Sequence, residues 1–253
     1  MHIETLGHGP DLVLLHGWAL NGGIFAPLLE RLSAQYRMHV VDLPGHGHSR
    51  GDDTPLALPH VVSAIAAATP PAVWLGWSLG GLFALHAAAT QPQVRGVAML
   101  AATPRFVRGS DWPHAVAPEV FAQFGHDLTQ DYRGTLDRFL ALDTLGSAHA
   151  QAELRTLRAT LCARGEPDAQ VLQDGLTLLE RSDLRRALPS LRVPSLWIGG
   201  QRDRLVPPAG MAAAAALAPN AQSLCIKGGG HAPFLGHADD VAEALDGFLS
   251  TLA

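Results

Sequence analysis

The sequence predicts an α/β fold, with a mostly parallel central sheet, helices on both faces and a helical cap. Two observations predict it. Strand-like apolar runs alternate with segments of helical spacing along most of the 253 residues, which is typical of a parallel sheet covered on both faces. The alternation stops between residues 109 and 186, where the spacing is helical throughout. We therefore expect a core formed by residues 1–108 and 187–253, and a cap at 109–186 inserted after the sixth strand.

The core elements follow one another in a regular order. Residues 1–4 are typical of the start of an edge strand, and apolar runs predict further strands at 11–16, 38–42, 72–77, 95–101, 194–199 and 223–227. Helical spacing predicts core helices at 24–34, 59–69, 79–90, 208–218 and 239–251, and cap helices at 118–129, 132–143, 148–163 and 168–181. A cap in this position covers the carboxyl edge of the sheet, where such sheets bind ligands.

Composition sets the broad class of the protein. A chain of 253 residues, 47% of them hydrophobic, buries a large core, and its net charge of −5 argues against a general nucleic-acid role. No positively charged start leads into an apolar stretch, so we expect no secretory signal and no membrane span. Cys162 and Cys225 are expected to be reduced, buried small hydrophobes of a cytosolic enzyme. No self-association motif is visible, and we expect a monomer.

A candidate nucleophile lies at residues 76–80, which match Gly-x-Ser-x-Gly between a predicted strand and a predicted helix. In this sharp turn the serine is held proud of the sheet edge, and the glycines leave room for the backbone to bend. Ser78 is therefore the candidate nucleophile. The alternative is a glycine-rich turn with an incidental capping serine, and the presence of catalytic partners decides between the two.

A serine hydroxyl needs a general base and a third group that orients this base. In this architecture the acid and then the histidine follow the serine along the chain. Asp203 lies just beyond the predicted strand 194–199, and His231 lies in the loop after 223–227. All three side chains should therefore meet at the carboxyl edge of the sheet, with His231 as the base and Asp203 as the orienting acid.

Both partners have competitors. Asp203 could instead pair with a neighbouring arginine on a solvated loop. Asp174 and Asp183 are weaker candidates for the acid because they lie in helical patterns. His231 could be a structural histidine, but its nearby rival His237 precedes a predicted helix start and is typical of a helix-entry residue.

A tetrahedral intermediate also needs N–H donors directed at its oxyanion. We expect one from the backbone of Leu79, directly after the nucleophile, and one from Trp18, in the loop after the strand 11–16. In that loop Gly17 permits the close backbone approach. His16 is expected to pack and to form hydrogen bonds there, since the chain order already assigns a base.

Other motifs carry little signal. The His-Gly-His segment at 46–48 lacks the carboxylate or cysteine ligands that would make a metal site. The glycine run at 228–230 lacks the Lys-Ser/Thr of a phosphate loop. We therefore expect no metal and no cofactor.

Together, His16-Gly17, the loop 42–49, the serine turn, the Asp203 loop and residues 230–233 resemble the α/β-hydrolase family over nearly the whole chain. Within it, residues 14–18, 74–81, 138–142 and 231–234 are similar to the carboxylesterases of biotin synthesis. This resemblance implies a serine esterase that removes the methyl ester from pimeloyl-acyl carrier protein. Its partner would be an acyl carrier protein that carries an esterified acyl chain.

The resemblance also suggests substrate-binding residues. Trp77 and Leu79 flank the nucleophile and are expected to contact the substrate, together with Trp18. Phe139 matches a residue that lines the acyl channel in the resembled enzymes. It could equally pack one cap helix on another.

An acyl carrier protein is acidic, so its docking surface should be positive. Arg138 and Arg155 match arginines of the resembled cap, and Arg158 lies beside them in the sequence. The chain departs from the pattern at Gly134 and Gln151, where further arginines are expected. These three arginines are our candidates for carrier-protein docking.

Other functions fit the same residues. A general short-chain carboxylesterase, a carbon–carbon bond hydrolase or a lactone hydrolase would use the same three catalytic groups. A non-catalytic ligand-binding module is a more distant alternative, which the intact Ser78, Asp203 and His231 disfavour. Haloalkane and epoxide chemistry in this family uses an aspartate nucleophile, and Ser78 argues against both.

Overall fold

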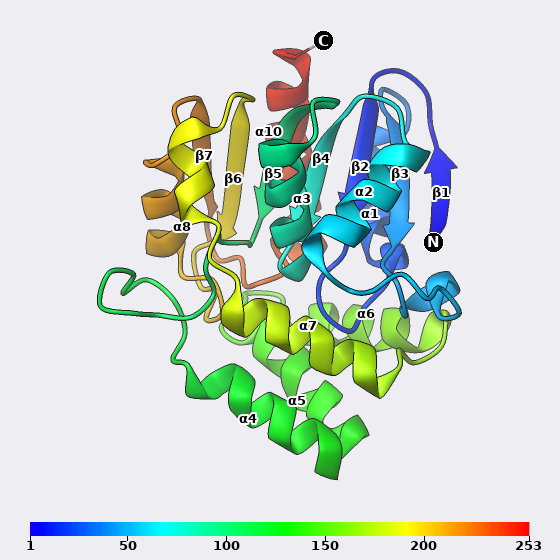
Figure 1. Cartoon of the computed structure of the whole chain (residues 1–253), viewed down its shortest axis with the longest axis vertical. Helices are drawn as coiled ribbons and strands as arrows, with labels where there is room; N and C mark the ends of the chain where they lie inside the picture. Colours follow the sequence, from blue (N-terminus) through cyan, green and yellow to red (C-terminus); the bar gives the residue numbers. More distant parts are fainter. Residues whose placement is uncertain (253) are drawn as a thin grey trace.

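The computed structural model describes residues 1–252, which form a single seven-stranded sheet flanked by helices (Figure 1). The sheet order is β1-β3-β2-β4-β5-β6-β7. The strands are β1 (His2–Leu6), β2 (Asp11–Leu15), β3 (Arg37–Asp42), β4 (Ala72–Trp77), β5 (Val94–Leu100), β6 (Ser195–Gly200) and β7 (Ala221–Ile226). Only β1 runs antiparallel among them, paired with β3. The predicted α/β fold is confirmed.

Helices cover both faces of the sheet, which explains why its central strands are apolar at nearly every position. In Figure 1, α2 (Leu58–Ala68) and α3 (Leu79–Thr90) lie in front of the sheet, and α1 (Ala26–Leu32) and α10 (Ala238–Ser250) lie behind it. At the left edge, α8 (Pro208–Ala215) packs on β6 and β7. Every residue of β4 is buried, as a strand between two helical layers requires. Short helical turns complete the core at η1 (Gly22–Phe25), η2 (Gly47–Ser49), η3 (Arg185–Ser190) and α9 (Pro233–Gly236).

The cap consists of four helices below the carboxyl edge of the sheet (Figure 1). They are α4 (Glu119–Gln130), α5 (Tyr132–Thr144), α6 (Ala150–Ala163) and α7 (Ala169–Arg181). We expected the insertion after the sixth strand, and this was wrong: it follows β5, the fifth. In the described part of the chain only one strand, β1, precedes β2, so five strands and not six come before the cap.

Three smaller expectations were also wrong. Cys162 and Cys225 are free but exposed, because Cys162 lies on the outer side of α6 and four consecutive residues of the edge strand β7, including Cys225, are exposed. Asp183 lies outside α7, which ends at Arg181, and it pairs with Arg185. The predicted helix 24–34 is divided between η1 and α1, with Pro27 in the first turn of α1.

One side of the cap is attached to the core by polar contacts. The guanidinium of Arg164, at the end of α6, lies 3.1 Å from both carboxylate oxygens of Asp42 and 3.1 Å from Glu4. The Asn21 amide donates to the carbonyl of Thr160, also in α6, at 2.8 Å. These contacts fix α6 over the end of β3.

In residues 1–252, no helix combines the length and the apolar character needed to cross a membrane. The longest of the cap helices, α6, has 14 residues. A span of the hydrocarbon region takes about 20.

Candidate active site

Ser78 occupies the turn between β4 and α3 in a strained backbone conformation. Its φ of 53° and ψ of −120° lie in a region that non-glycine residues rarely adopt. Glycines on both sides make the turn possible: a Cβ at Gly76 would lie 2.3 Å from the carbonyl oxygen of Gly80, and one at Gly80 would lie 2.1 Å from that of Leu15. Ser78 N–H donates to Leu100 in β5 at 3.1 Å, which fixes the turn to the sheet.

The structure brings Ser78, His231 and Asp203 together from three loops. His231 Nε2 lies 2.8 Å from Ser78 Oγ, and His231 Nδ1 lies 2.8 Å from Asp203 Oδ2. The other carboxylate oxygen of Asp203 accepts N–H bonds from Leu205 and Val206, at 2.8 and 2.9 Å. This is the arrangement in which a serine is deprotonated by a histidine that an aspartate orients.

The same contacts set the protonation of the imidazole. Burial lowers the pKa of His231, but the charge of Asp203 and its hydrogen bond to the ring raise it by more, and Asp143 contributes further. The pKa of His231 therefore lies above its ordinary value. The contacts that raise this pKa also stabilise the imidazolium that forms when His231 takes the serine proton.

The rivals for these roles lie elsewhere. Asp174 is in α7, where it accepts from Gln170, and His237 directly precedes α10, the helix-entry position that the sequence indicated. Arg202 does not pair with Asp203; its guanidinium donates to the carbonyl of Gly146. The predicted proximity of Ser78, Asp203 and His231 is thus present, while their catalytic role stays a prediction.

The loop after β2 lies directly against Ser78. A Cβ at Gly17 would lie 3.2 Å from that of Ser78 and 2.9 Å from the Trp77 ring, so the close approach depends on glycine. Leu79 is the first residue of α3, and its N–H therefore has no acceptor within the helix. Trp18 and Leu79 stay our predicted oxyanion donors, now on two segments that meet at the serine.

His16 has the packing role that we expected. Its Nδ1–H donates to the carbonyl of Gly17 at 2.8 Å, and its Nε2 accepts from the N–H of Leu43 at 3.0 Å. Burial lowers the pKa of His16, which keeps the ring neutral in this role. The ring thus connects the Trp18 loop to the end of β3.

Trp77 positions the loop that carries the base. Its indole N–H donates to the carbonyl of His231 at 2.8 Å, and its ring packs edge-on against Phe234. The ring centroids of Trp77 and His231 are 5.8 Å apart. Its expected contact with substrate stays a prediction.

The cap closes over the serine with aromatic side chains. Phe139 of α5 packs on Trp18 with ring centroids 4.5 Å apart, and on Phe124 of α4 at 5.3 Å. Trp18 is fixed in turn by its indole N–H, which donates to the carbonyl of Leu172 in α7 at 2.9 Å. Phe139 therefore joins two cap helices, as one of the two alternatives suggested, and it also packs on the loop beside Ser78; its place in an acyl channel stays a prediction. With Ser78 only 3% exposed, the site is closed in this conformation.

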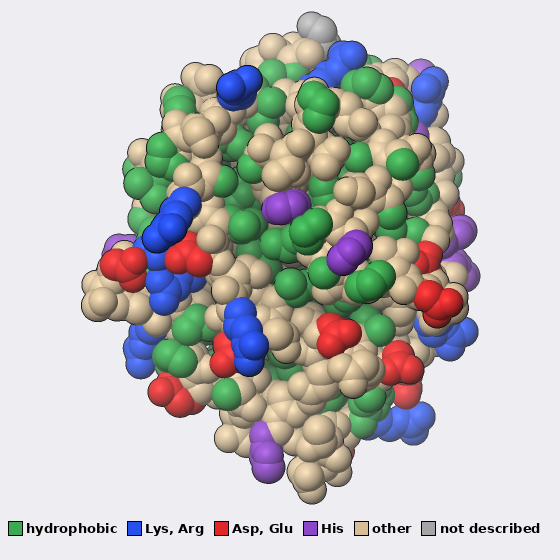
Figure 2. All heavy atoms as spheres, viewed as in Figure 1, with side chains coloured by type: hydrophobic (Ala, Val, Ile, Leu, Met, Phe, Trp, Pro, Cys, Tyr) green, Lys and Arg blue, Asp and Glu red, His purple; other side chains and the backbone are tan. Residues whose placement is uncertain are grey.

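The three candidate docking arginines lie on the cap surface in different surroundings. Arg138 pairs with Asp127 and Asp131, and Arg158 forms two hydrogen bonds to Asp137. Arg155 has no ion-pair partner within residues 1–252. On the face shown in Figure 2, acidic and basic side chains are interspersed over the cap.

Sequence reasoning missed Asp143, a buried carboxyl group of α5 beside the base. Its main-chain carbonyl accepts the N–H of His231 at 3.0 Å, and both its carboxyl oxygens are buried without a hydrogen-bond partner in the described chain. One signal could have found it. Asp143 follows Phe139 by four residues, so it lies on the helix face that covers the site.

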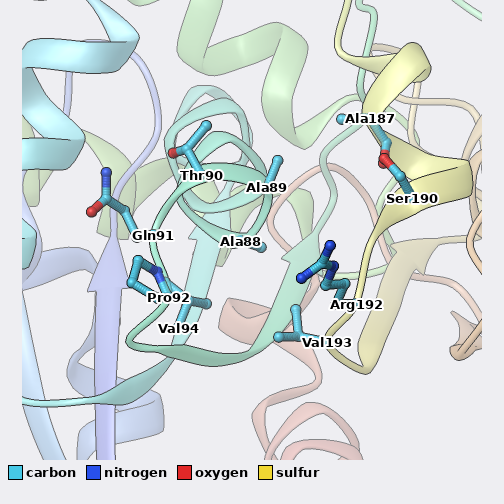
Figure 3. A pocket seen from close by; sticks show the side chains of 10 residues that line it. All are labelled: Ala88, Ala89, Thr90, Gln91, Pro92, Val94, Ala187, Ser190, Arg192 and Val193. Atoms are coloured by element: carbon cyan, nitrogen blue, oxygen red, sulfur yellow. The ribbon is translucent and has the colours of Figure 1, made fainter.

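A hollow of about 510 Å³ lies away from this site. Figure 3 shows it between the end of α3, the start of β5 and the segment that leads into β6, lined among others by Thr90, Val94 and Arg192. These are the amino ends of the strands, whereas Ser78 follows the carboxyl end of β4. The hollow is therefore no entrance to Ser78.

Comparison with known proteins agrees with the geometry. A protein-family model described as "Alpha/beta hydrolase family" matches residues 12–244. A protein of Xanthomonas campestris pv. campestris (strain B100) named pimeloyl-[acyl-carrier protein] methyl ester esterase is 77% identical over 252 residues, covering 100% of both chains. A protein of the same name from Stenotrophomonas maltophilia (strain K279a) is 70% identical, covering 100% of this chain and 98% of its own.

Solved structures share the fold. A bromoperoxidase from Bacillus anthracis has a TM-score of 0.89 at 24% identity, covering 98% of this chain and 94% of its own. The esterase EaEST from Exiguobacterium antarcticum has a TM-score of 0.85 at 22% identity, covering 98% and 95%. The sheet, the serine turn and the family match over residues 12–244 lead to one conclusion: the chain belongs to the alpha/beta hydrolase family.

Proposed function

We propose that this chain is a serine carboxylesterase that hydrolyses the methyl ester of pimeloyl-acyl carrier protein in biotin synthesis. The products are methanol and pimeloyl-acyl carrier protein with a free carboxylate. The observation that carries the chemistry is the continuous hydrogen-bonded series from Ser78 through His231 to Asp203. The substrate is supported by the full-length relatives of that name at 70 to 77% identity.

In the proposed reaction Ser78 Oγ attacks the ester carbonyl while His231 Nε2 takes the hydroxyl proton. Asp203 holds Nδ1–H, so Nε2 is free to accept. The oxyanion of the tetrahedral intermediate would be bound by the N–H groups of Trp18 and Leu79, each worth about 3 kcal/mol of transition-state stabilisation.

The intermediate then collapses. His231 gives its proton to the methoxy oxygen, methanol leaves, and an acyl-Ser78 ester remains. A water molecule, deprotonated by His231, attacks this ester through a second tetrahedral intermediate. The proton returns to Ser78 Oγ, and the free carboxylate is released.

The cap gives this reaction its substrate preference in our proposal. We propose residues 109–186 as the cap domain on a core of residues 1–108 and 187–253, since all four additional helices lie within that insertion. The aromatic roof formed by Trp18 and Phe139 suits an acyl chain. Arg138, Arg155 and Arg158 on its outside would attract an acidic carrier protein. We expect the enzyme to work as a cytoplasmic monomer.

The test is rescue of a biotin-requiring bacterial strain that lacks its methyl ester esterase. We expect the wild-type gene to restore growth without biotin, and Ser78→Ala, expressed at the same level, to fail. If the wild type fails to rescue but hydrolyses p-nitrophenyl esters, the chain is a general short-chain esterase instead. If it hydrolyses neither, the esterase proposal itself is wrong.

A further inference from the structure

The Asp143 carboxyl group differs from the other buried carboxylates of this protein. Asp42 and Asp203 are also buried, but Asp203 accepts two main-chain N–H bonds, and Asp42 accepts two such bonds and the Arg164 guanidinium. Asp143 is 1% exposed, and neither of its oxygens has a hydrogen-bond partner within residues 1–252. Because an unpaired buried carboxylate is costly, such a group holds its proton unless a nearby cation compensates the charge.

The nearest candidate for that cation is the base itself. Asp143 O accepts the N–H of His231, so the two residues are adjacent through the main chain. Phe139, one helical turn earlier, packs on Trp18, so this face of α5 is directed at the active site. Asp143 is therefore a buried residue on the face of α5 that packs over the active site, bonded through its main chain to His231.

Two ionisable groups act on Asp143, and they act in opposite directions. Burial raises the pKa of Asp143 to about 7, with the charge of His231 lowering it and that of Asp203 raising it. Asp143 in turn is one of the groups that raise the pKa of His231. The protonation of each of these two side chains therefore depends on that of the other.

Other charged groups on the neighbouring elements have their own partners or face solvent. On α4 and α5, Arg138 pairs with Asp127 and Asp131, and on α6 Arg158 pairs with Asp137. Glu153 of α6 is bonded to Ser147, near His149 and His237. Arg202 donates to Gly146, and Arg155 is exposed. His231 and Asp203 are therefore the charged groups that act on the Asp143 carboxyl group.

We propose that Asp143 is a positioning residue for the hydrolytic reaction, whose buried carboxyl group is electrostatically coupled to His231 and so sets the pH at which the imidazole is free to act as a base. With the proton on Asp143, His231 is neutral and can deprotonate Ser78. With the proton on His231, the pair is an imidazolium beside a carboxylate, and the base is blocked. The inference rests on the proposed role of His231.

The consequence has a definite sign. In the wild type, ionised Asp143 stabilises the imidazolium and moves the loss of the His231 proton to higher pH. Asp143→Asn keeps the shape but removes this charge, so the acid limb of the kcat/KM profile should move to lower pH by about half a unit or more. A purely structural role would lower the rate at every pH without moving the limb.

The experiment compares pH profiles for p-nitrophenyl acetate, read at the wavelength where phenol and phenolate absorb equally, for the wild type, Asp143→Asn and Glu153→Gln. Glu153 is a matched control, since it is another buried cap carboxyl group with a raised pKa but bonds to Ser147. We expect only Asp143→Asn to move the limb. If the acid limbs of the kcat/KM profiles of the wild type and Asp143→Asn coincide, the proposal is overturned.

A second measurement needs no activity. The infrared difference between the wild type and Asp143→Asn in D₂O should contain the carbonyl band of a protonated carboxylic acid at mildly acidic pH, and this band should disappear as the pH passes through the neutral range. Absence of the band at every pH would overturn the proposed coupling even if ester hydrolysis is normal, because Asp143 would then never hold a proton. If the wild type hydrolyses no ester but the band titrates, the proposed function fails while the protonated Asp143 stands.

Discussion

The main-chain N–H of His231 donates a 3.0 Å hydrogen bond to the carbonyl of Asp143, which joins the base of the core to a helix of the cap. On its other side the carbonyl of His231 accepts the indole N–H of Trp77 at 2.8 Å. The main chain of His231 is thus held from two directions, by β4 and by α5. If the cap opens to admit substrate at α5, the first of these bonds breaks, so closure of the cap and alignment of the base are linked.

The other edge of the cap is held by an ion pair, and its loss should weaken the whole fold. In Arg164→Met, the buried carboxylate of Asp42 keeps its main-chain donors but loses its guanidinium partner, and we expect unfolding to become easier by about 3 kcal/mol. Urea denaturation measures this. The control is Arg158→Met, which removes an exposed pair with Asp137 and should cost at most about 1 kcal/mol. Equal effects of the two variants would contradict the proposed importance of the Arg164–Asp42 ion pair for stability.

Asp203→Asn tests the orientation of the imidazole. An amide at this position cannot accept Nδ1–H in the same way while keeping both main-chain bonds, so kcat should fall by about 10⁴-fold. Because the charge of Asp203 raises the pKa of His231, the residual activity should have its acid limb at lower pH. Steady-state rates from mildly acidic to neutral pH check both points. An unchanged kcat would mean that another acid orients the base.

Gly80→Ala tests the contact between the serine turn and β2. The new methyl group would lie 2.1 Å from the main-chain oxygen of Leu15, so the backbone must shift, and we expect a loss of more than about 3 kcal/mol. Gly247, in α10, has no atom within 4 Å of such a methyl group. Gly247→Ala should therefore stabilise the protein by about 0.5 to 1 kcal/mol. Thermal unfolding of both variants measures these changes in stability. A Gly80→Ala variant as stable as the wild type would contradict the close contact between residue 80 and β2.

The sequence was sufficient for the parts of the site that depend on local pattern. The serine turn was recognisable because its strained conformation needs glycines at fixed positions, and Asp203 and His231 were recognisable because each follows a strand of the same parallel sheet. Asp143 was not recognisable in this way. Its importance comes from burial without a partner, which depends on how α5 packs over the His231 loop and not on any motif.

Contacts between segments far apart in the sequence could not be predicted either. The pairing of Arg164 with Asp42 joins residues 122 positions apart, and the sequence gives Arg164 no more weight than other cap arginines. The prediction that the two cysteines are buried was wrong for the same reason, since a cysteine in a helix or strand is buried only if a neighbouring element covers that face.

Carrier-protein docking should depend most on the arginine without a partner. Arg155→Glu should raise KM for the carrier-linked ester several-fold, through lost steering, and leave p-nitrophenyl acetate hydrolysis unchanged. Arg158→Glu places the same charge on a residue whose guanidinium already bonds Asp137, and its effect on KM should be smaller. Measuring KM at low and high salt separates the two variants. A loss of activity on both substrates would indicate a structural effect instead.

The most direct measurement is hydrolysis of purified pimeloyl-acyl carrier protein methyl ester, followed by mass spectrometry of the carrier. We predict conversion to the free acid, with kcat/KM at least about tenfold above that for dimethyl pimelate because binding energy from the carrier is used, and no conversion by Ser78→Ala. A carrier ester that stays intact while Ser78 hydrolyses simple esters would contradict the proposed substrate.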